Sequence, residues 1–99
     1  NLPFVLVVAN DAAWGMEKML QGGIFGWDRI VVADLQPTRY DRIAEALGAH
    51  GEHVEEPAQL RPALERALAS GRPALVNVVM RMTPSAMTLA GVERKRKLD

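Results

Sequence analysis

The sequence has no cysteine among its 99 residues. Disulfides, a thiolate nucleophile and zinc sites built on thiolates are therefore excluded together. A lack of cysteine also fits a reducing compartment, so we expect a cytoplasmic protein.

A net charge is lacking as well, because 12 basic residues balance 12 acidic ones. A neutral chain offers no overall attraction to nucleic acid or to an anionic membrane, so we expect neither as a partner. The basic run at residues 94–97 is interpreted as a solvated chain end. Small-molecule chemistry is the function class that this composition favours.

The sequence has no long apolar run either. The longest, residues 4–9, is far shorter than the roughly 20 residues that a membrane-spanning helix needs, and no charged-then-apolar signal segment opens the chain. We therefore expect a soluble protein. Because the chain lacks an initiator methionine and runs almost directly into a strand-like segment, we expect a piece of a longer polypeptide, with one domain at most.

Two segments are apolar on both faces rather than alternating, residues 4–9 and residues 74–80. This pattern is typical of strands that are covered on both sides, as in a parallel sheet. Residues 30–33 are expected to form a short strand or an extended connection, and residues 53–55 an edge strand.

Helical periodicity is clear in two places, where apolar residues recur at i, i+3 and i+4. The first helix is predicted over residues 40–47, with Gly48 as its C-terminal cap. The second is predicted over residues 60–68, with Pro57 suited to its first turn and Gly71 beyond its end.

A third, shorter helix is predicted over residues 14–21, because the pair Gly22 and Gly23 follows it. Strands and helices then alternate along residues 1–80, which predicts an α/β fold of three layers, α/β/α, with a mostly parallel sheet. Residues 81–99 show no such pattern, and we interpret them as a C-terminal tail or arm that packs on something outside this chain.

A carboxylate stands where the first predicted strand ends, at Asp11 in the run from Asn10 to Ala13. In open α/β sheets, ligands bind just outside the carboxyl ends of the strands. Asp11 offers a hard oxygen, the small side chains of Ala12 and Ala13 leave main-chain carbonyls approachable, and the start of the next helix attracts anions. These features suit magnesium and phosphate. The alternative, which spacing alone favours, is that Asn10 and Asp11 merely end the strand and cap a helix.

Three stretches stand in a fixed order along residues 1–80: LPFVLVVAND, then AWGM, then YDRIAEALGAHGEHVEEPAQLRPALERALASGRPALVNVVM. In this order they resemble the carboxyl-terminal half of the pyrophosphate-binding domain of thiamine-diphosphate-dependent enzymes, particularly the acetolactate synthase large subunit. In that family a Gly-Asp-Gly motif is followed about thirty residues later by Asn-Asn at the end of a strand, and both segments hold magnesium and the cofactor's diphosphate. The resemblance implies a partial thiamine-diphosphate-binding fold with thiamine diphosphate and Mg²⁺ as cofactors.

Carried over to this sequence, Asp11 falls where the second Asn of that pair gives a side-chain oxygen to magnesium. The main-chain carbonyl of Ala13 falls at a second metal ligand, and Asn10 lies behind the metal, where it hydrogen-bonds the loop. Asp in place of Asn is a departure from the family pattern. It keeps a monodentate oxygen and adds charge, so we expect metal ligation to survive.

The resemblance also implies cofactor contacts for the next residues. Trp14 is a candidate for stacking on the cofactor, with packing as the alternative. Gly15 permits close approach, and Met16 matches an apolar residue near the cofactor in acetolactate synthases. Glu17 is a candidate catalytic acid, because related decarboxylases carry a Glu there that takes part in proton transfer. The alternative, which the helical pattern favours, is a solvated Glu in the first turn of a helix.

The expected function is that of an enzyme fragment, part of a thiamine-diphosphate-dependent synthase or lyase that acts on 2-oxo acids and is a homodimer or homotetramer at full length. An oxalyl-CoA or 2-hydroxyacyl-CoA decarboxylase or lyase is the alternative within the superfamily, because the pattern Leu35-x-Pro37-x-x-Tyr40 and the run from Gly48 to Gly51 resemble those enzymes too. Outside it, the rival is a non-catalytic α/β interaction domain.

The histidines His50 and His53, with acidic residues nearby, could suggest a metal site. Their spacing is not that of two histidines on one face of a helix, and Gly51 stands between them. A solvated turn and edge strand is the interpretation that we prefer. For Trp27 we expect packing rather than a ligand contact.

Overall fold

The computed structural model describes residues 2–83 and 86–97. The chain forms two compact units. We call them the sheet unit, residues 1–10 and 38–80, and the helical unit, residues 11–37 and 81–99.

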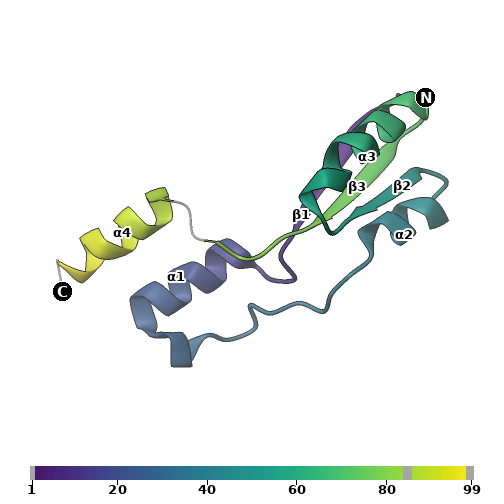
Figure 1. The fold of residues 1–99 in the computed structure, drawn as a ribbon. Helices are drawn as coiled ribbons and strands as arrows, with labels where there is room; N and C mark the ends of the chain where they lie inside the picture. The colour runs from purple at the N-terminus through teal and green to yellow at the C-terminus, as the bar shows by residue number, and fades with distance from the viewer. Residues whose placement is uncertain (1, 84–85, 98–99) are drawn as a thin grey trace. The chain divides into compact units, whose positions relative to one another are not determined.

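The sheet unit holds three parallel strands, β1 (Val5–Asn10), β2 (His50–Val54) and β3 (Ala74–Val79), in the order β1-β3-β2 (Figure 1). The helix α2 (Tyr40–Ala46) precedes β2, and α3 (Pro57–Ala69) connects β2 to β3. Parallel strands need such crossover connections, since a tight hairpin would reverse the chain. The predicted α/β fold with a parallel sheet is confirmed.

The two helices of the sheet unit cover opposite faces of the sheet (Figure 1). Alternate residues of a strand point to opposite faces, and along β3 the side chains of Ala74, Val76 and Val78 pack with α3. The residues between them face α2, where Leu75 lines a groove with the helix and Asn77 approaches Asp41. This arrangement gives the three layers that the sequence predicts.

Local signals explain why the helices begin and end where they do. Pro57 opens α3, and a capping box joins Glu56 and Gln59, whose side chain accepts from the Glu56 N–H at 3.0 Å. Gly48 follows α2 with φ of 87°, the left-handed conformation that glycine adopts without strain. Both helices agree with the predicted positions.

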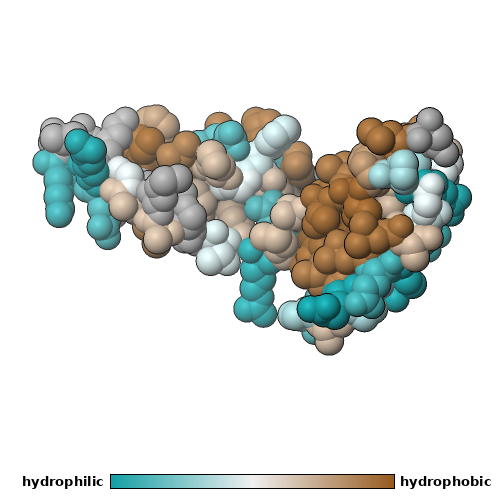
Figure 2. Space-filling view, turned by 90° about the horizontal axis from the view of Figure 1, so that it is seen from above, coloured by the Kyte–Doolittle hydropathy of each residue, from teal (hydrophilic) through white to brown (hydrophobic). Residues whose placement is uncertain are grey.

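The strands depart from expectation in two respects. β2 begins at His50, ahead of the predicted residues 53–55, because it pairs along β3 from Ala74 onward. β1 was expected to be covered on both faces, yet Leu6 and Val7 are each 49% exposed. The sheet unit therefore presents apolar surface, which appears as a brown patch on its side of the molecule (Figure 2).

Part of this surface is a groove of about 180 Å³ in the sheet unit, between α2 and the face of the sheet that it covers. Leu6 of β1 and Phe4 just before that strand line one side, and Ile43 of α2 and its C-cap residue Leu47 line the other. Between 49% and 83% of the surface of these four side chains is exposed.

The helical unit contains α1 (Gly15–Phe25), a short 3-10 turn η1 (Trp27–Arg29) and α4 (Ala86–Arg96). The prediction that Gly22 and Gly23 end the first helix is wrong, because α1 continues to Phe25. Gly22 instead leaves room for the ring of Trp27, since a Cβ on Gly22 would lie 2.5 Å from Trp27 Cε3. The Trp27 ring thus contacts Gly22, although 55% of the residue's surface is exposed, so the expected packing is only partial.

Two further segments of the helical unit are relevant to the sequence predictions. Residues 30–33 form no strand but a connection that bends at Val32, whose φ is 53°. In the described part of the helical unit, Ala13 and Asp34 form an isolated antiparallel bridge. The helix α4, which packs against α1, lies in the stretch interpreted as a tail or arm and was not predicted. Within the described residues, no helix has the length and apolar character needed to cross a membrane.

Candidate functional site

Asp11 follows the last residue of β1 and begins a tight loop. Its Oδ1 accepts a hydrogen bond from the Ala13 N–H at 3.2 Å, which is the geometry of an Asx turn. Ala12 has φ of 53°, a left-handed conformation that is uncommon for a residue with a side chain. The strand therefore ends in a sharp turn, and the Asp11 carboxylate accepts a hydrogen bond from the main chain of that turn.

The next residue, Ala13, lies in a short antiparallel bridge. Its neighbours Ala12 and Trp14 make the main-chain hydrogen bonds to residues 33–35, each at 2.8 Å. In such a pair the central residue directs its own N–H and C=O away from the opposite segment. The Ala13 N–H points to Asp11, so the Ala13 carbonyl lies on the same side of the chain as the Asp11 carboxylate.

Gly15, the first residue of α1, lies close to this carboxylate. A Cβ on Gly15 would stand 2.2 Å from Asp11 Oδ2, so any larger residue would displace the carboxylate. The N-cap residue of α1 is Trp14, which makes no side-chain cap bond. Asp11 is thus not the N-cap residue, and its carboxylate is held by the turn instead.

The remaining sequence candidates lie at the start of α1. Trp14 is 58% exposed and Met16 is 68% exposed, so both side chains present apolar surface to solvent. Glu17 is exposed in the first turn of the helix, where the helix dipole favours an acid. The next residue, Lys18, forms an ion pair with Asp34.

Two hydrogen bonds of Asn10 lie within the sheet unit. Its Nδ2 donates to the Thr38 carbonyl oxygen and to Asn77 Oδ1, each at 3.0 Å. Asn77 is fully buried, and the sequence interpretation missed it. A signal was available, because Asn77 is the one polar residue in the apolar stretch of β3.

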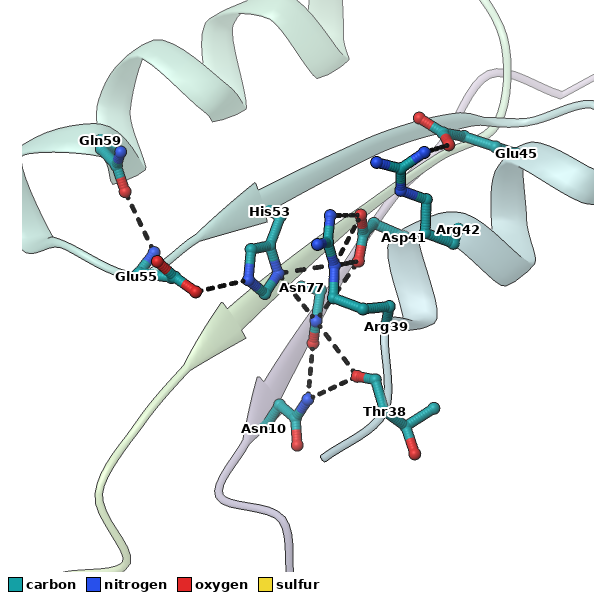
Figure 3. Close-up of polar contacts among 10 residues, drawn as sticks. All are labelled: Asn10, Thr38, Arg39, Asp41, Arg42, Glu45, His53, Glu55, Gln59 and Asn77. Atoms are coloured by element: carbon teal, nitrogen blue, oxygen red, sulfur yellow. Dashed lines mark hydrogen bonds and ion pairs between the residues drawn. The ribbon is translucent and has the colours of Figure 1, made fainter. Parts of the chain in front are cut away.

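The buried Asp41 in the first turn of α2 is held by a charged partner (Figure 3). Arg39 Nη2 lies 2.6 Å from Asp41 Oδ2, and Arg39 Nε donates to Asp41 Oδ1 at 2.9 Å. These hydrogen bonds hold the pKa of Asp41 below its ordinary value, against the opposing effect of burial. Asp41 is therefore a buried carboxylate with its charge compensated.

His50 belongs to an ion-pair network that joins β2 to α3. Glu52 accepts from Arg66 Nη2 at 2.7 Å and contacts His50 Nε2 at 2.8 Å. The hydrogen bond from Arg66, with a smaller effect of His50, lowers the pKa of Glu52. No group of three or more metal-ligating side chains occurs in the described part of the chain.

The fold is that of an α/β protein with an open parallel sheet and a turn after its first strand. Residues 1–78 match the family described as thiamine pyrophosphate enzyme, C-terminal TPP binding domain. The chain therefore belongs to this family of thiamine-diphosphate-dependent enzymes, and the family expected from the sequence is confirmed.

Similar curated proteins support membership of the same family. A probable acetolactate synthase of Mycobacterium bovis and the acetolactate synthase large subunit IlvG of Mycobacterium tuberculosis are each 54% identical over 80 residues, covering 80% of this chain and 14% of the relative. A 2-hydroxyacyl-CoA lyase 2 of Caenorhabditis elegans is 39% identical over 89 residues, covering 84% of this chain and 14% of the relative. The chain thus spans only a small part of the length of these relatives.

Proposed function

We propose that this chain is part of a thiamine-diphosphate- and magnesium-dependent enzyme that acts on 2-oxo acids, and that the turn after β1 anchors the metal and the diphosphate. The observation that carries the proposal is the placement of the Asp11 carboxylate and the Ala13 carbonyl on one side of the same turn. Two hard oxygens in that arrangement suit Mg²⁺. Membership of the family supports the cofactor.

In this proposal Asp11 gives one carboxylate oxygen and Ala13 its main-chain oxygen to the metal. Magnesium prefers six oxygens in near-octahedral geometry, so the diphosphate, water and residues outside this chain complete the set. Gly15 keeps the space that the carboxylate occupies. We accordingly expect the 99-residue chain by itself to be inactive, because it carries only part of the metal's ligands.

The other proposed contacts position the cofactor. Asn10 presents its carboxamide at the end of β1, and the exposed apolar surfaces of Trp14 and Met16 offer packing for the cofactor. Bound thiamine diphosphate supplies the nucleophilic carbon and the electron sink for cleaving or forming the bond next to a carbonyl. Glu17 remains a candidate for moving a proton there, with a helix-surface role as the alternative.

We further propose that the complete enzyme is a cytoplasmic homodimer or homotetramer. The support is the family resemblance, which implies a glutamate from another domain, commonly across a dimer interface, that activates the cofactor. The complete assembly then brings that residue to the ligands of this chain.

The test uses the full-length polypeptide that carries this segment. Calorimetry with thiamine diphosphate should show binding that depends on Mg²⁺, and an assay should show consumption of a 2-oxo acid such as pyruvate. Failure of the cofactor to bind in the presence of magnesium would contradict the proposal.

A second candidate substrate class is a 2-hydroxyacyl-CoA, because a relative named 2-hydroxyacyl-CoA lyase 2 is 39% identical over 89 residues. The same preparation should be assayed with a 2-hydroxyacyl-CoA and an oxalyl-CoA. Carbon–carbon bond cleavage in these CoA thioesters, without consumption of 2-oxo acids, would favour the lyase or decarboxylase over the synthase.

A further inference from the structure

Each strand of the sheet brings one polar side chain to the carboxyl end of the sheet: Asn10 on β1, Asn77 on β3 and His53 on β2 (Figure 3). Asn10 Nδ2 lies 3.0 Å from Asn77 Oδ1, and Asn77 Nδ2 lies 3.1 Å from His53 Nδ1. Asn77 is 0% exposed in an otherwise apolar strand. A buried carboxamide costs stability unless it is hydrogen-bonded, so apolar packing does not account for its presence.

One main-chain carbonyl fixes the direction of this series of hydrogen bonds. The Thr38 oxygen can only accept, and it lies 3.0 Å from Asn10 Nδ2, so the amide nitrogen of Asn10 faces inward. Asn77 then turns its oxygen to Asn10. Its nitrogen lies 3.1 Å from His53 Nδ1, nearer than the Thr38 carbonyl oxygen at 3.4 Å and Asp41 Oδ1 at 3.5 Å. His53 Nδ1 is consequently the ring nitrogen without a proton, because it accepts from Asn77.

The other nitrogen of the His53 ring agrees with this assignment. Nε2 lies 3.1 Å from Glu55 Oε1, and an ionised carboxylate can only accept, so Nε2 carries the proton. The main-chain N–H of Glu55 donates in turn to Gln59 Oε1 at 3.1 Å, which ties this end of the series to α3. The neutral Nε2–H tautomer thus satisfies both sides of the ring.

We propose that Asn77 and His53 are positioning residues for Asn10: His53 in its Nε2–H form orients the carboxamide of Asn77, which orients that of Asn10. The inference rests on the proposed function, in which Asn10 is one of the cofactor-binding residues. With both hydrogens of its Nδ2 directed at fixed acceptors, Asn10 holds its amide oxygen on the side away from the network (Figure 3). An orientation set before binding lowers the entropy cost of binding the cofactor.

Protonation of His53 breaks the series. A charged ring has a hydrogen on each nitrogen, so Nδ1 can no longer accept from Asn77 and instead faces the Asp41 carboxylate, 3.7 Å away. The charged groups around the ring are Asp41, which is paired with Arg39 at the start of α2, and Glu55 after β2.

Imidazole nitrogen NMR of the 99-residue chain tests the first step without any cofactor. At a pH where histidine is neutral, His53 should be in the Nε2–H tautomer, with Nδ1 showing the shift of a hydrogen-bond acceptor. The Nδ1–H tautomer would overturn the inference, because that form cannot accept from Asn77.

Two substitutions at His53 test the positioning role in the full-length protein. His53→Asn can place an acceptor where Nδ1 stands and cannot titrate, whereas His53→Leu removes the acceptor. In His53→Leu the magnesium-dependent affinity for thiamine diphosphate should fall by about tenfold, while in His53→Asn it should stay within about twofold of the unaltered protein. The value of kcat at saturating cofactor should be unchanged in both variants.

The comparison with Asp11→Ala separates the two proposals. Normal cofactor binding in His53→Leu, together with weakened binding in Asp11→Ala, would reject the positioning role and leave the proposed function standing. Normal binding in both variants would reject the proposed function, and the positioning role with it.

Discussion

Gly15 lies so close to Asp11 that a Cβ on the glycine would stand 2.2 Å from Asp11 Oδ2. Gly15→Ala should therefore displace the carboxylate and weaken magnesium-dependent cofactor binding by about tenfold, equivalent to about 1.4 kcal/mol. Calorimetry on the full-length protein measures this change.

The matched control for that variant is Gly91→Ala, also in a helix. A Cβ on Gly91 meets no atom within 4 Å, so this variant should bind the cofactor as the unaltered protein does. Equal affinity of Gly15→Ala and Gly91→Ala for the cofactor would show that cofactor binding does not depend on the observed position of the Asp11 carboxylate.

Glu17 offers a test of the catalytic role suggested by related decarboxylases. Its carboxylate is exposed in the first turn of α1, which fits a helix-surface role, so Glu17→Gln should leave kcat within about twofold. Steady-state kinetics with a 2-oxo acid give the answer. A fall of about a hundredfold in kcat would instead assign proton transfer to Glu17.

The Arg39 and Asp41 pair predicts a pH dependence of stability. The pKa of Asp41 is lower in the folded state than its ordinary value of 3.8, so the pair stabilises the fold fully above that pH and loses its effect as the pH falls through the lowered pKa. Arg39→Gln should lower the unfolding free energy at neutral pH more than loss of an exposed ion pair does, because it leaves a buried carboxylate without its charged partner. The difference should shrink in acid.

Urea unfolding at several pH values measures this effect. Arg61→Gln is the control, since Arg61 and Glu65 are 3.9 Å apart with side chains 88% and 67% exposed. Such surface pairs contribute about 0–1 kcal/mol. If Arg39→Gln lowers the unfolding free energy no more than Arg61→Gln does, the buried pair does not contribute specifically to stability.

The exposed apolar groove predicts how the 99-residue chain behaves in solution. Ile43 and Leu47 are 50% and 83% exposed, and together with Phe4 and Leu6 they form a shared exposed apolar surface. We expect self-association in sedimentation experiments, and Ile43→Glu should reduce it. Leu68→Glu is the control, because Leu68 is 71% exposed on α3 and does not line the groove. A monomeric unaltered chain would contradict the expectation.

The sequence allowed most of the sheet unit to be predicted, because its signals are local. Gly48 and Pro57 mark helix ends, and the apolar stretches of β1 and β3 indicate parallel strands, although β1 is more exposed than its sequence predicts. The path of α1 through Gly22 could not be predicted in the same way, since it depends on contact with the ring of Trp27. The start of β2 depends likewise on pairing with a distant strand.

In the candidate site, too, some residues could be identified from the sequence and others could not. Asp11 could be singled out because a carboxylate at the end of an apolar strand is visible in the sequence itself, and the family resemblance added a role. Asn10 and Asn77 are 67 positions apart, and Asn77 and His53 are 24 apart, so no periodicity reveals that their side chains meet. Only the fold brings these residues together.

The measurement that tests the account most directly is the magnesium-dependent affinity for thiamine diphosphate of two variants of the full-length protein, Asp11→Ala and Asp11→Asn. The first removes the proposed metal ligand, whereas the second restores the residue that the family pattern carries and keeps a monodentate oxygen. We predict that affinity falls by about tenfold or more in Asp11→Ala and is largely retained in Asp11→Asn. Affinity in Asp11→Ala equal to that of the unaltered protein would contradict the assignment of Asp11 to the metal.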